Sequence, residues 1–231
     1  MLRAAISRVR GRAPEPARGA VLPLELYPSP ALRVVCTPVP TSGDASAPAP
    51  ATSATSAAAA AAALVPALLA TAAAHGALGL AAPQVGSALR AFCMRAPVAW
   101  TGAEARRATA AARARAARAP SFFCLLNPRV VARSEETSVL MEACLSLPDA
   151  PAVVRRAASV RVEYVDAASG ALVERDLSGL PAAVFQHELD HLDGVLISDR
   201  AMTFFRGTEQ DETEAARDAF SFALHKYYGL H

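Results

Sequence analysis

The residues best suited to chemistry are two histidines four positions apart, in the segment His187-Glu188-Leu189-Asp190-His191. On an α-helix, positions i and i+4 lie one above the other on the same face, so both imidazoles can reach one metal ion. Glu188 stands beside them and can accept or return a proton. Two exposed histidines among surface carboxylates are the alternative, but the flanking residues are apolar at helical spacing. The pattern predicts a metal centre on a helix.

A catalytic metal centre of this kind uses three protein ligands and leaves one position for water, so two histidines are one ligand short. Upstream, Cys144 stands in the segment MEACLSLP, residues 141–148, and could supply a thiolate. A single cysteine is more often a small buried apolar residue. Metallopeptidases usually take their third ligand from downstream of the histidine pair, and this chain has acids there: Glu209, Asp211, Glu212 and Glu214. The residues alone leave both sources of the third ligand open.

Strands must bring Cys144 to the histidine helix, and the sequence between them has strand character. Residues 121–128 (SFFCLLNP) predict an apolar strand that stops at Asn-Pro. Residues 160–164 alternate apolar and polar, which predicts a strand with one buried face. A turn over residues 166–170 and a returning strand over 172–177 complete a hairpin.

The apolar period then changes from two to that of a helix over residues 181–193. Ser178 could cap the start of this helix, and Gly194 suits its end. A final amphipathic helix is predicted over about residues 209–228. Strands and helices that do not alternate one for one predict an α+β fold.

The first half of the chain is less regular. It predicts an extended entry segment (22–39), a low-complexity insertion (41–63) and a helix (67–74). A loop (79–86), a short strand (91–95) and an Ala/Arg-rich insertion (101–119) follow. One domain, residues 22–231, would therefore carry two insertions and follow a tail of residues 1–21. The apolar run at residues 57–69 is shorter than a membrane span and contains Pro66, so no span is expected.

Three segments, in order, resemble the peptide deformylase family. Residues 77–84 (ALGLAAPQ) are similar to the family's G-x-G-L-A-A-x-Q. Residues 142–146 (EACLS) resemble E-G-C-L-S, and residues 186–191 (QHELDH) match Q-H-E-x-D-H. The resemblance covers about residues 22–200 and leaves out the arginine-rich start and both insertions. It implies a deformylase-like fold in which antiparallel strands pack around the metal-binding helix.

The resemblance implies a hydrolase that removes the formyl group from the N-terminal formylmethionine of nascent peptides. Cys144, His187 and His191 would bind one divalent metal ion, natively Fe²⁺, with Zn²⁺, Ni²⁺ or Co²⁺ able to occupy the site. Glu188 would take a proton from the attacking water and return it to the leaving amine. The Gln84 side-chain amide and the Leu145 backbone N–H would stabilise the developing oxyanion.

The resemblance also implies residues that bind the substrate or support the site. The substrate-binding group is Gly79, Leu140, Glu142, Leu180, Ala183 and Val184. Gly79 would let a peptide backbone approach closely. The apolar members would line a pocket for the methionine side chain, with ordinary core packing as the alternative. Gln186 and Glu142 would hold the site, and Asp190 would pair with Arg156 to orient the helix.

The chain departs from the family pattern at two glycines. Ala77 replaces the first motif glycine, although Gly76 precedes it, and Ala143 replaces the glycine before the cysteine. If the backbone at Ala143 needs a positive φ, alanine adds strain of about 1 kcal/mol. If substrate passes over it, the methyl group narrows the cleft.

Charge is concentrated at the periphery. The net charge of the whole chain is +2, but residues 1–20 and residues 101–120 each hold five arginines and one glutamate, a net charge of +4 in each segment. This distribution argues against a specific nucleic-acid-binding core. Residues 1–20 also have the composition of a mitochondrial transit peptide, with a disordered basic tail in a cytoplasmic protein as the alternative. The four cysteines are widely spaced without a C-x-x-C pair, which fits a reducing compartment.

Three other functions stay open at this stage. A zinc metallopeptidase would use a downstream acid and dispense with Cys144. A non-catalytic relative would bind nascent chains or ribosomes through the basic segments and carry no metal. A general amidase would hydrolyse formyl and acetyl substrates at equal rates.

Overall fold

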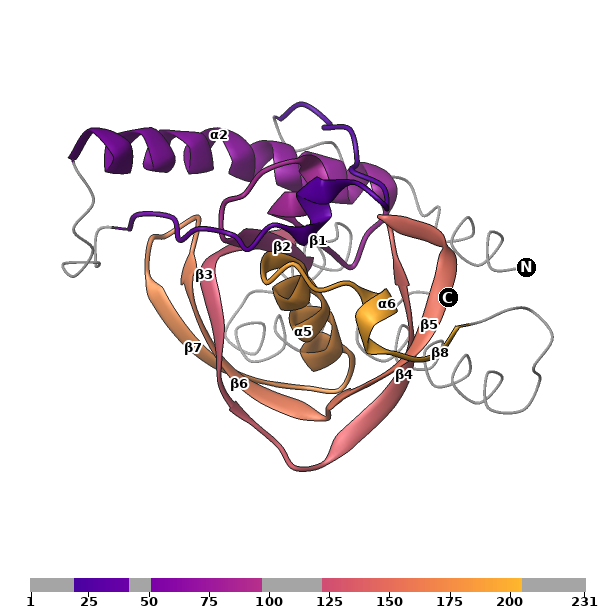
Figure 1. Ribbon diagram of the computed structural model, residues 1–231. Helices are drawn as coiled ribbons and strands as arrows, with labels where there is room; N and C mark the ends of the chain where they lie inside the picture. Colours follow the sequence, from indigo (N-terminus) through magenta and orange to yellow (C-terminus); the bar gives the residue numbers. More distant parts are fainter. Residues whose placement is uncertain (1–18, 42–50, 97–121, 205–231) are drawn as a thin grey trace, which may run out of the picture.

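The computed structural model describes residues 19–41, 51–96 and 122–204 (Figure 1). Four predictions fall wholly or mostly outside these ranges: the arginine-rich tail up to residue 18, the first insertion before residue 51, the second insertion at 101–119, and the C-terminal helix at 209–228.

The described chain forms two antiparallel sheets and a few helices. In chain order the elements are η1 (Pro30–Arg33), α2 (Ala51–His75), β1 (Gly79–Ala81), η2 (Ala82–Val85), β2 (Ala91–Arg95), β3 (Phe122–Arg133), β4 (Thr137–Cys144), β5 (Leu147–Ala157), β6 (Ser159–Asp166), β7 (Leu172–Ser178), α5 (Leu180–Leu192), α6 (Ile197–Arg200) and β8 (Ala201–Phe204). The strand orders are β1-β2-β3-β6-β7 and β4-β5-β8.

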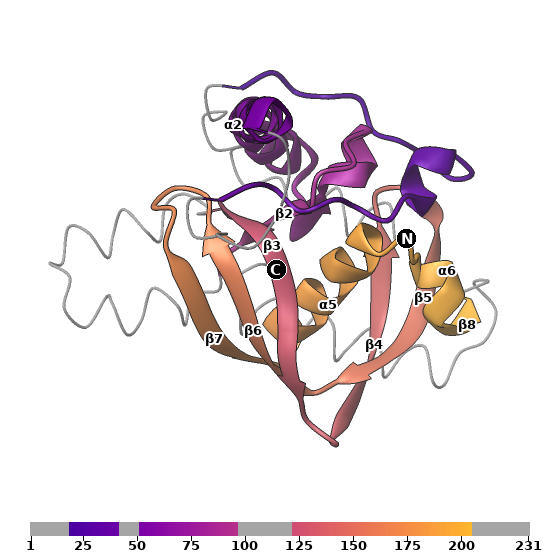
Figure 2. The same cartoon turned by 60° about the vertical axis from the view of Figure 1, so that its left-hand side comes forward.

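Helix α5 lies in the angle between the two sheets, with β3, β6 and β7 on one side and β4 and β5 on the other (Figures 1 and 2). Every residue of α5 except Asp190 is buried. Phe185 packs edge-to-face on Phe92 of β2, with ring centroids 5.2 Å apart. A helix enclosed on both sides by sheets has to be buried nearly all round. The α+β prediction, with antiparallel strands around a central helix, is confirmed.

The boundaries of α5 are close to the predicted 181–193, but its cap differs. Ser178 is the last residue of β7 and pairs with Ser159, so its backbone is committed to the sheet. Gly179 is the N-cap residue instead, at φ 62° and ψ −138°. At the other end Gly194 has φ 71°, as expected for a glycine that follows a helix.

Helix α2 is longer than predicted. It starts at Ala51 rather than near residue 67 and continues through Pro66 to His75, so part of the first low-complexity segment is helical. Alanine has the highest helix propensity, which offsets the proline. By length and composition alone, Ala57–His75 could cross a membrane; it is longer than the apolar run expected at residues 57–69 and is the one such segment in the described ranges. Leu68 and Ala72 are nevertheless fully buried against the strands, as in a helix of a globular core.

Two further boundaries differ from the prediction. The segment expected to be a loop at residues 79–86 holds strand β1 and the short helix η2. Strand β3 runs through Asn127-Pro128 to Arg133, because the register shifts there and absorbs the proline. Asn127 adopts φ 51°, and its side-chain amide exchanges two 2.7 Å hydrogen bonds with the backbone of Val39. The structure confirms three predicted strands: the short strand at 91–95, the alternating strand at 160–164 and its hairpin partner at 172–177.

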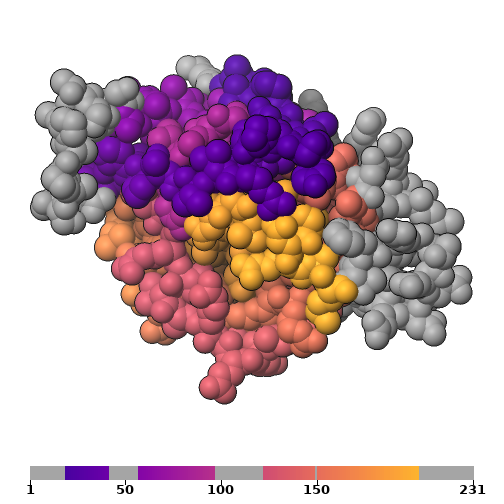
Figure 3. All heavy atoms as spheres, in the orientation of Figure 1, coloured from indigo at the N-terminus to yellow at the C-terminus, as the bar shows by residue number. Residues whose placement is uncertain are grey.

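The N-terminal segment is extended, as predicted, apart from η1. It crosses one face of the molecule beside α5 and α6 (Figure 3). The backbone N–H of Glu25 donates to the Gln84 carbonyl at 2.8 Å, and that of Tyr27 donates to the Ser146 carbonyl at 2.9 Å. The segment thus connects η2, which follows the first sheet's edge strand, to the turn after β4 of the second sheet.

Candidate metal centre

Strand β4 delivers Glu142 and Cys144 to the interior. In a strand, residues two apart face the same side, and both of these side chains are buried. The register shifts between them, where Ala143 of β4 stands opposite residues 148–151 of β5, so the extra residues lie on β5 and the alternation along β4 is kept; Ala143 is exposed. Cys144 pairs directly with Leu147, so residues 145 and 146 form a two-residue turn. The chain therefore reverses direction immediately after Cys144.

Helix α5 delivers His187 and His191 on one face, as their spacing predicted. The Cys144 Sγ atom lies 3.3 Å from Nε2 of His191. The Cys144 sulfur and one ring nitrogen each of His187 and His191 all lie within 4.8 Å of one another. The structure thus brings the sulfur to the two rings, and this donor set fits a divalent first-row metal ion.

Gln84 reaches the same point from η2. Its Oε1 atom accepts a 2.9 Å hydrogen bond from the Ala81 backbone N–H, which turns the amide nitrogen toward the cysteine. That nitrogen lies 3.5 Å from Cys144 Sγ and donates to Ser146 Oγ at 3.2 Å. Gln84 is 2% exposed, so this orientation is fixed by buried contacts.

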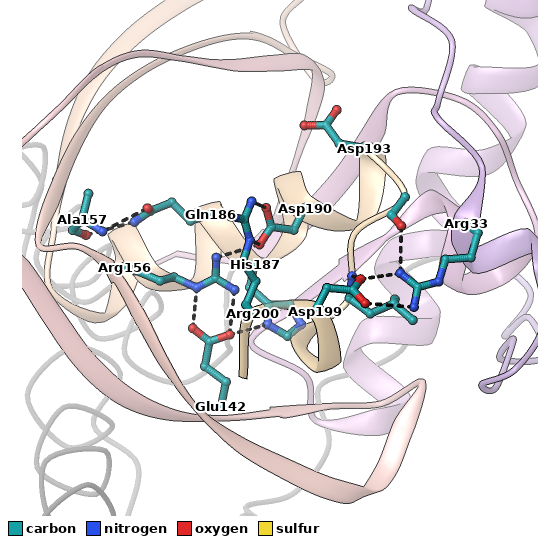
Figure 4. A network of polar contacts seen from close by, with 12 residues as sticks. Arg33, Glu142, Arg156, Ala157, Gln186, His187, Asp190, Asp193, Asp199 and Arg200 are labelled. Atoms are coloured by element: carbon teal, nitrogen blue, oxygen red, sulfur yellow. Dashed lines mark hydrogen bonds and ion pairs between the residues drawn. The ribbon is translucent and has the colours of Figure 1, made fainter. Parts of the chain in front are cut away.

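A charged network connects His187 to residues of β4, β5 and α6 (Figure 4). Glu142 Oε2 accepts from His187 Nδ1 at 2.8 Å, which leaves Nε2 of that ring available on the site side. The Arg156 guanidinium binds both oxygens of Glu142 and also Asp190, the latter at 2.8 Å. Arg200 binds Asp190 from the surface at 2.8 Å. The predicted pair of Asp190 and Arg156 is confirmed, and both Glu142 oxygens are occupied by supporting contacts rather than facing a substrate.

Burial and these partners shift the pKa values of the carboxyl groups in opposite directions. Burial acts to raise the pKa of Glu142, but the hydrogen bonds from Arg156 and His187 outweigh it and lower the pKa to about 2. Burial raises the pKa of Glu188 to about 7, opposed by His187. Glu142 is thus held as an anion, whereas Glu188 can gain and lose a proton near neutral pH.

The two imidazoles also differ. Burial lowers the pKa of His191 well below its usual value, and the nearby His187 and Arg156 act in the same direction. His191 is therefore neutral and offers a lone pair, as a metal ligand must. For His187, burial acts to lower the pKa, but hydrogen bonds with Cys144 and Glu142 outweigh burial. The net result is a pKa well above the ordinary histidine value.

Glu188 lies against β1. A Cβ atom built on Gly79 would lie 2.7 Å from both Cγ and Cδ of Glu188, closer than real Cβ contacts. The absence of a side chain at Gly79 therefore permits the close approach of the Glu188 side chain, and the approach of a peptide backbone at Gly79 stays a prediction. Oε2 of Glu188 is buried without a hydrogen-bond partner among the described residues. A buried carboxylate oxygen of this kind is suited to meet a group brought by a ligand.

The remaining predicted residues lie around this centre. Gln186 binds the Ala157 backbone through both ends of its amide and so ties α5 to β5. The four predicted pocket residues are buried members of the main core cluster, and their contact with methionine stays a prediction: Leu140, Leu180, Ala183 and Val184. Leu145, in the turn after Cys144, is half-buried.

The two departures from the family glycines cause no backbone strain. Asn127 is the one non-glycine residue with positive φ in the described chain, so Ala143 adopts an ordinary strand conformation. Gly76, at φ 64°, takes the left-handed position after α2 and leaves Ala77 to pack in the core. The strain considered for Ala143 is therefore not present.

Two contributors were missed by the sequence interpretation. Ser146 is fully buried and accepts from Gln84, although it stood inside the EACLS segment that carried the resemblance. Arg200 follows the helix by eight residues and reaches back to Asp190, a contact that no local spacing predicts.

The sequence and the fold of this chain are both similar to those of known proteins. The family model described as polypeptide deformylase matches residues 21–204. A peptide deformylase of Rhizobium meliloti is 36% identical over 203 residues, which cover 85% of this chain and 98% of the relative. One from Mesorhizobium japonicum is 35% identical and matches 78% of this chain and 83% of its own. For the Thermotoga neapolitana relative, 38% identical, the match spans 63% of its length.

Solved structures agree with the sequence relatives. The peptide deformylase from Thermotoga maritima is 28% identical, with a TM-score of 0.58, and the alignment covers 79% of this chain and 99% of that one. A class I type b enzyme from Acinetobacter baumannii, bound to Met-Ala-Ser, is 27% identical with a TM-score of 0.56. The family model matches most of the chain, and the Rhizobium meliloti relative and the Thermotoga maritima structure align almost end to end. This chain belongs to the polypeptide deformylase family, whose members are divalent-metal hydrolases that remove the formyl group from N-terminal formylmethionine.

Proposed function

We propose that this chain hydrolyses the N-formyl group of peptides that begin with formylmethionine and releases formate. The observation that carries the proposal is the assembly of five side-chain groups of four chemical kinds in one buried place. They are the three candidate metal ligands, the carboxyl group of Glu188 and the amide of Gln84.

Cys144, His187 and His191 would hold the metal. We propose Fe²⁺ as the native ion, with Zn²⁺, Ni²⁺ and Co²⁺ able to replace it, since a set of one thiolate and two imidazoles suits all four. When bound, such an ion supplies Lewis acidity that polarises a carbonyl and makes water more acidic. Glu142 and Arg156 would keep the His187 ring oriented with Nε2 toward the ion.

Glu188 would carry the proton. It lies next to the histidines, and its Oε2 atom has no described partner to displace. It would take a proton from the attacking water as the water oxygen bonds to the formyl carbon. It would then give that proton to the amine nitrogen as the carbon–nitrogen bond breaks, so formate and a free methionine amine leave.

Gln84 and Leu145 would stabilise the negative charge that grows on the formyl oxygen. The Gln84 amide is held with its N–H donors toward Cys144, and the backbone N–H of Leu145 follows Cys144 directly. Fixed donors stabilise a developing oxyanion without reorganising during the reaction. Removing one such donor from other hydrolases costs about 100- to 1,000-fold in kcat.

The substrate class follows from the relatives. The Acinetobacter structure holds Met-Ala-Ser, a peptide with a free methionine at its start. We propose that this chain binds the same kind of product, with the methionine side chain near Leu140, Leu180, Ala183 and Val184. These side chains belong to one apolar cluster, to which α5 contributes three and β4 contributes Leu140.

A formate-release assay tests the proposal. Protein loaded with Ni²⁺ should release formate from formyl-Met-Ala-Ser and leave acetyl-Met-Ala-Ser almost untouched, and Glu188→Gln should lower the rate by several orders of magnitude. Equal rates on the two peptides would indicate a general amidase. No formate from metal-loaded protein would indicate a non-catalytic relative, and cleavage inside an unformylated peptide would indicate a metallopeptidase.

We also propose that residues 1–20 direct the chain to mitochondria, as their arginine-rich composition supports. Fusing them to a fluorescent reporter should give a mitochondrial signal, and a diffuse cytoplasmic signal would contradict this.

A ribosome contact through the basic segments at residues 1–20 and 101–120 is a further part of the proposal. It predicts salt-sensitive co-sedimentation with ribosomes that is lost when the arginines of residues 101–120 are replaced by glutamine.

A further inference from the structure

Cys93 and Cys124 face each other across two adjacent antiparallel strands, away from the metal centre. Cys93 lies in β2, Cys124 lies in β3, and the two are direct partners in the register. Neither residue has a part in the proposed hydrolysis. They are also the one pair of cysteines among the described residues that the strand register places opposite each other.

The hydrogen-bond pattern shows which kind of pair this is. In an antiparallel ladder, pairs that exchange backbone hydrogen bonds alternate with pairs that do not, and the latter have Cα atoms about 4.5 Å apart. The Cys124 carbonyl accepts from the N–H of Ala167, on the side away from β2. On the same ladder, the Asn127 N–H donates to the Arg90 carbonyl, so Asn127 and Arg90 form a hydrogen-bonded pair. Cys93 and Cys124 lie three pairs further along, and because bonded and non-bonded pairs alternate, they are a non-hydrogen-bonded pair.

This geometry matches the reach of a disulfide bond. Disulfides join residues whose Cα atoms lie about 4.4–6.8 Å apart, and a non-hydrogen-bonded pair falls within that range. The two side chains also point to the same face of the sheet, because directly opposed residues share a face. Little backbone movement would be needed to link them.

Helix α2 covers the pair. Cys93 is fully buried and Cys124 is 4% exposed, within a small cluster that includes Leu68 and Leu80. The Cys93 thiol approaches the Leu68 carbonyl at 3.7 Å, and the Cys124 thiol approaches that of Val65 at 4.0 Å. Both thiols thus lie directly under one turn of α2, and the contacts that they make with its carbonyl groups are weak ones.

Burial also determines how the pair would react. It raises the pKa of the Cys93 thiol well above its ordinary value, and the neighbouring Cys124 thiol adds to this effect. Cys93 therefore stays protonated and is a poor first target for an oxidant. Cys124 is the member with some exposed surface, so it is the one that an oxidant can reach when α2 moves.

We propose that Cys93 and Cys124 form a reversible cross-strand disulfide when the protein meets a peroxide. The sulfur of Cys124 attacks one peroxide oxygen, the oxygen–oxygen bond breaks, and Cys124 becomes a sulfenic acid as one water leaves. The thiol of Cys93 then attacks that sulfur, the sulfur–sulfur bond forms, and a second water leaves. Two thiols are oxidised, one hydrogen peroxide is reduced, and a dithiol reductant reverses the change.

The bond would close a loop of thirty residues between the two cysteines. Closing a loop of this size lowers the entropy of the unfolded chain and stabilises the folded state. We expect the melting temperature of the oxidised protein to rise by roughly 5–10 °C, and the rise to disappear on reduction.

Peptide mapping tests the proposal directly. Cleavage at arginine places Cys93 in residues 91–95 and Cys124 in residues 119–129, while Cys36 and Cys144 fall in two other peptides. Ni²⁺-loaded protein treated with hydrogen peroxide and digested under alkylating conditions should yield the cross-linked pair of residues 91–95 and 119–129, 2 Da lighter than the two peptides together. Dithiothreitol should separate them.

Matched variants complete the experiment. Cys93→Ser and Cys124→Ser should each abolish the cross-link and the rise in melting temperature. Cys36→Ser changes a cysteine of the main core, 5% exposed, and should leave both effects intact. The proposal is overturned if folded wild-type protein gives sulfinic or sulfonic acid at Cys124 without the cross-link, or if Cys93 links to a different cysteine.

Discussion

The replacement of Gly79 by alanine is the perturbation whose outcome the geometry fixes most closely. The new Cβ atom would lie 2.7 Å from Cγ and Cδ of Glu188, and closer still to Oε1. An ordinary contact needs about 3.4 Å, so the carbon atoms of Glu188 must retreat by at least 0.7 Å and its carboxylate by more. The side chain is 4% exposed, so it can retreat only against packed neighbours.

A displacement of about 1 Å in a reacting group costs roughly 100-fold in rate. We therefore expect Gly79→Ala to lower kcat for formate release by about 100-fold, which corresponds to about 2.7 kcal/mol in the activation free energy. The three atoms nearest the new methyl group all belong to Glu188 and none to a candidate metal ligand, so metal content should stay at the wild-type level. Steady-state kinetics with formyl-Met-Ala-Ser and metal analysis of the same samples measure both quantities.

Gly170→Ala is the matched control, since it makes the same change at a glycine far from the site. Gly170 has φ 71° and no atom within 4 Å of a built Cβ. It should therefore cost about 1 kcal/mol of stability through backbone strain and leave kcat unchanged. If Gly79→Ala keeps full metal and kcat within threefold of wild type, the position of Glu188 against Gly79 does not govern the reaction and the reasoning is wrong.

Two other substitutions separate buried from exposed charge. Glu142→Gln leaves Arg156 without its buried counter-ion and weakens the support of His187, so we expect a loss of about 3 kcal/mol in the free energy of unfolding and 10- to 100-fold weaker metal binding. Denaturant melts and a metal titration measure these, and wild-type values in both would refute the supporting role. Asp199→Asn breaks an exposed pair with Arg33 and should cost less than about 1 kcal/mol at pH 7. Because the Arg33 hydrogen bond lowers the pKa of Asp199 in the folded state, the contribution is present above the ordinary pKa and lost as the pH falls through the folded value. The difference in stability between wild type and variant should therefore shrink steadily as the pH falls below the ordinary aspartate pKa, and a difference that stays constant as the pH falls would contradict this assignment.

Much of the candidate site was predictable because its residue types recur at fixed spacing. His187 and His191 share a helix face for any regular helix, so local sequence suffices to place them together. Cys144 lies 43 positions before His187, and no periodicity links them. The resemblance to a family supplied that contact, and the register shift between β4 and β5 with the turn that follows Cys144 supplies the geometry.

The errors have a common physical origin, since each came from a local rule that tertiary structure overrode. Asn127-Pro128 is a strong signal for the end of a strand, yet β3 continues because Asn127 tolerates positive φ and binds Val39. Pro66 usually breaks a helix, but the surrounding alanines and the packing of Leu68 and Ala72 retain α2. Such compensations depend on partners far away in the sequence.

The function of Gly79 could not have been deduced from sequence alone for a similar reason. A glycine within the segment ALGLAAPQ suggests that another group approaches the backbone closely there, but the sequence does not say which group. In the structure that group is Glu188, which lies 109 positions later in the chain. Arg200, Asp190 and Arg156 form a chain of charges in the same manner, from three separate elements.

In the proposed site, one sulfur and two imidazole nitrogens of this chain share a single metal ion. X-ray absorption spectroscopy of the Zn²⁺-loaded protein tests this arrangement without any assay of activity. We expect one sulfur at about 2.3 Å and two imidazole nitrogens at about 2.0–2.1 Å from the zinc, with the sulfur signal lost in Cys144→Ser. A first shell made only of nitrogen and oxygen in the wild-type protein, or an unchanged sulfur signal in the variant, would contradict it.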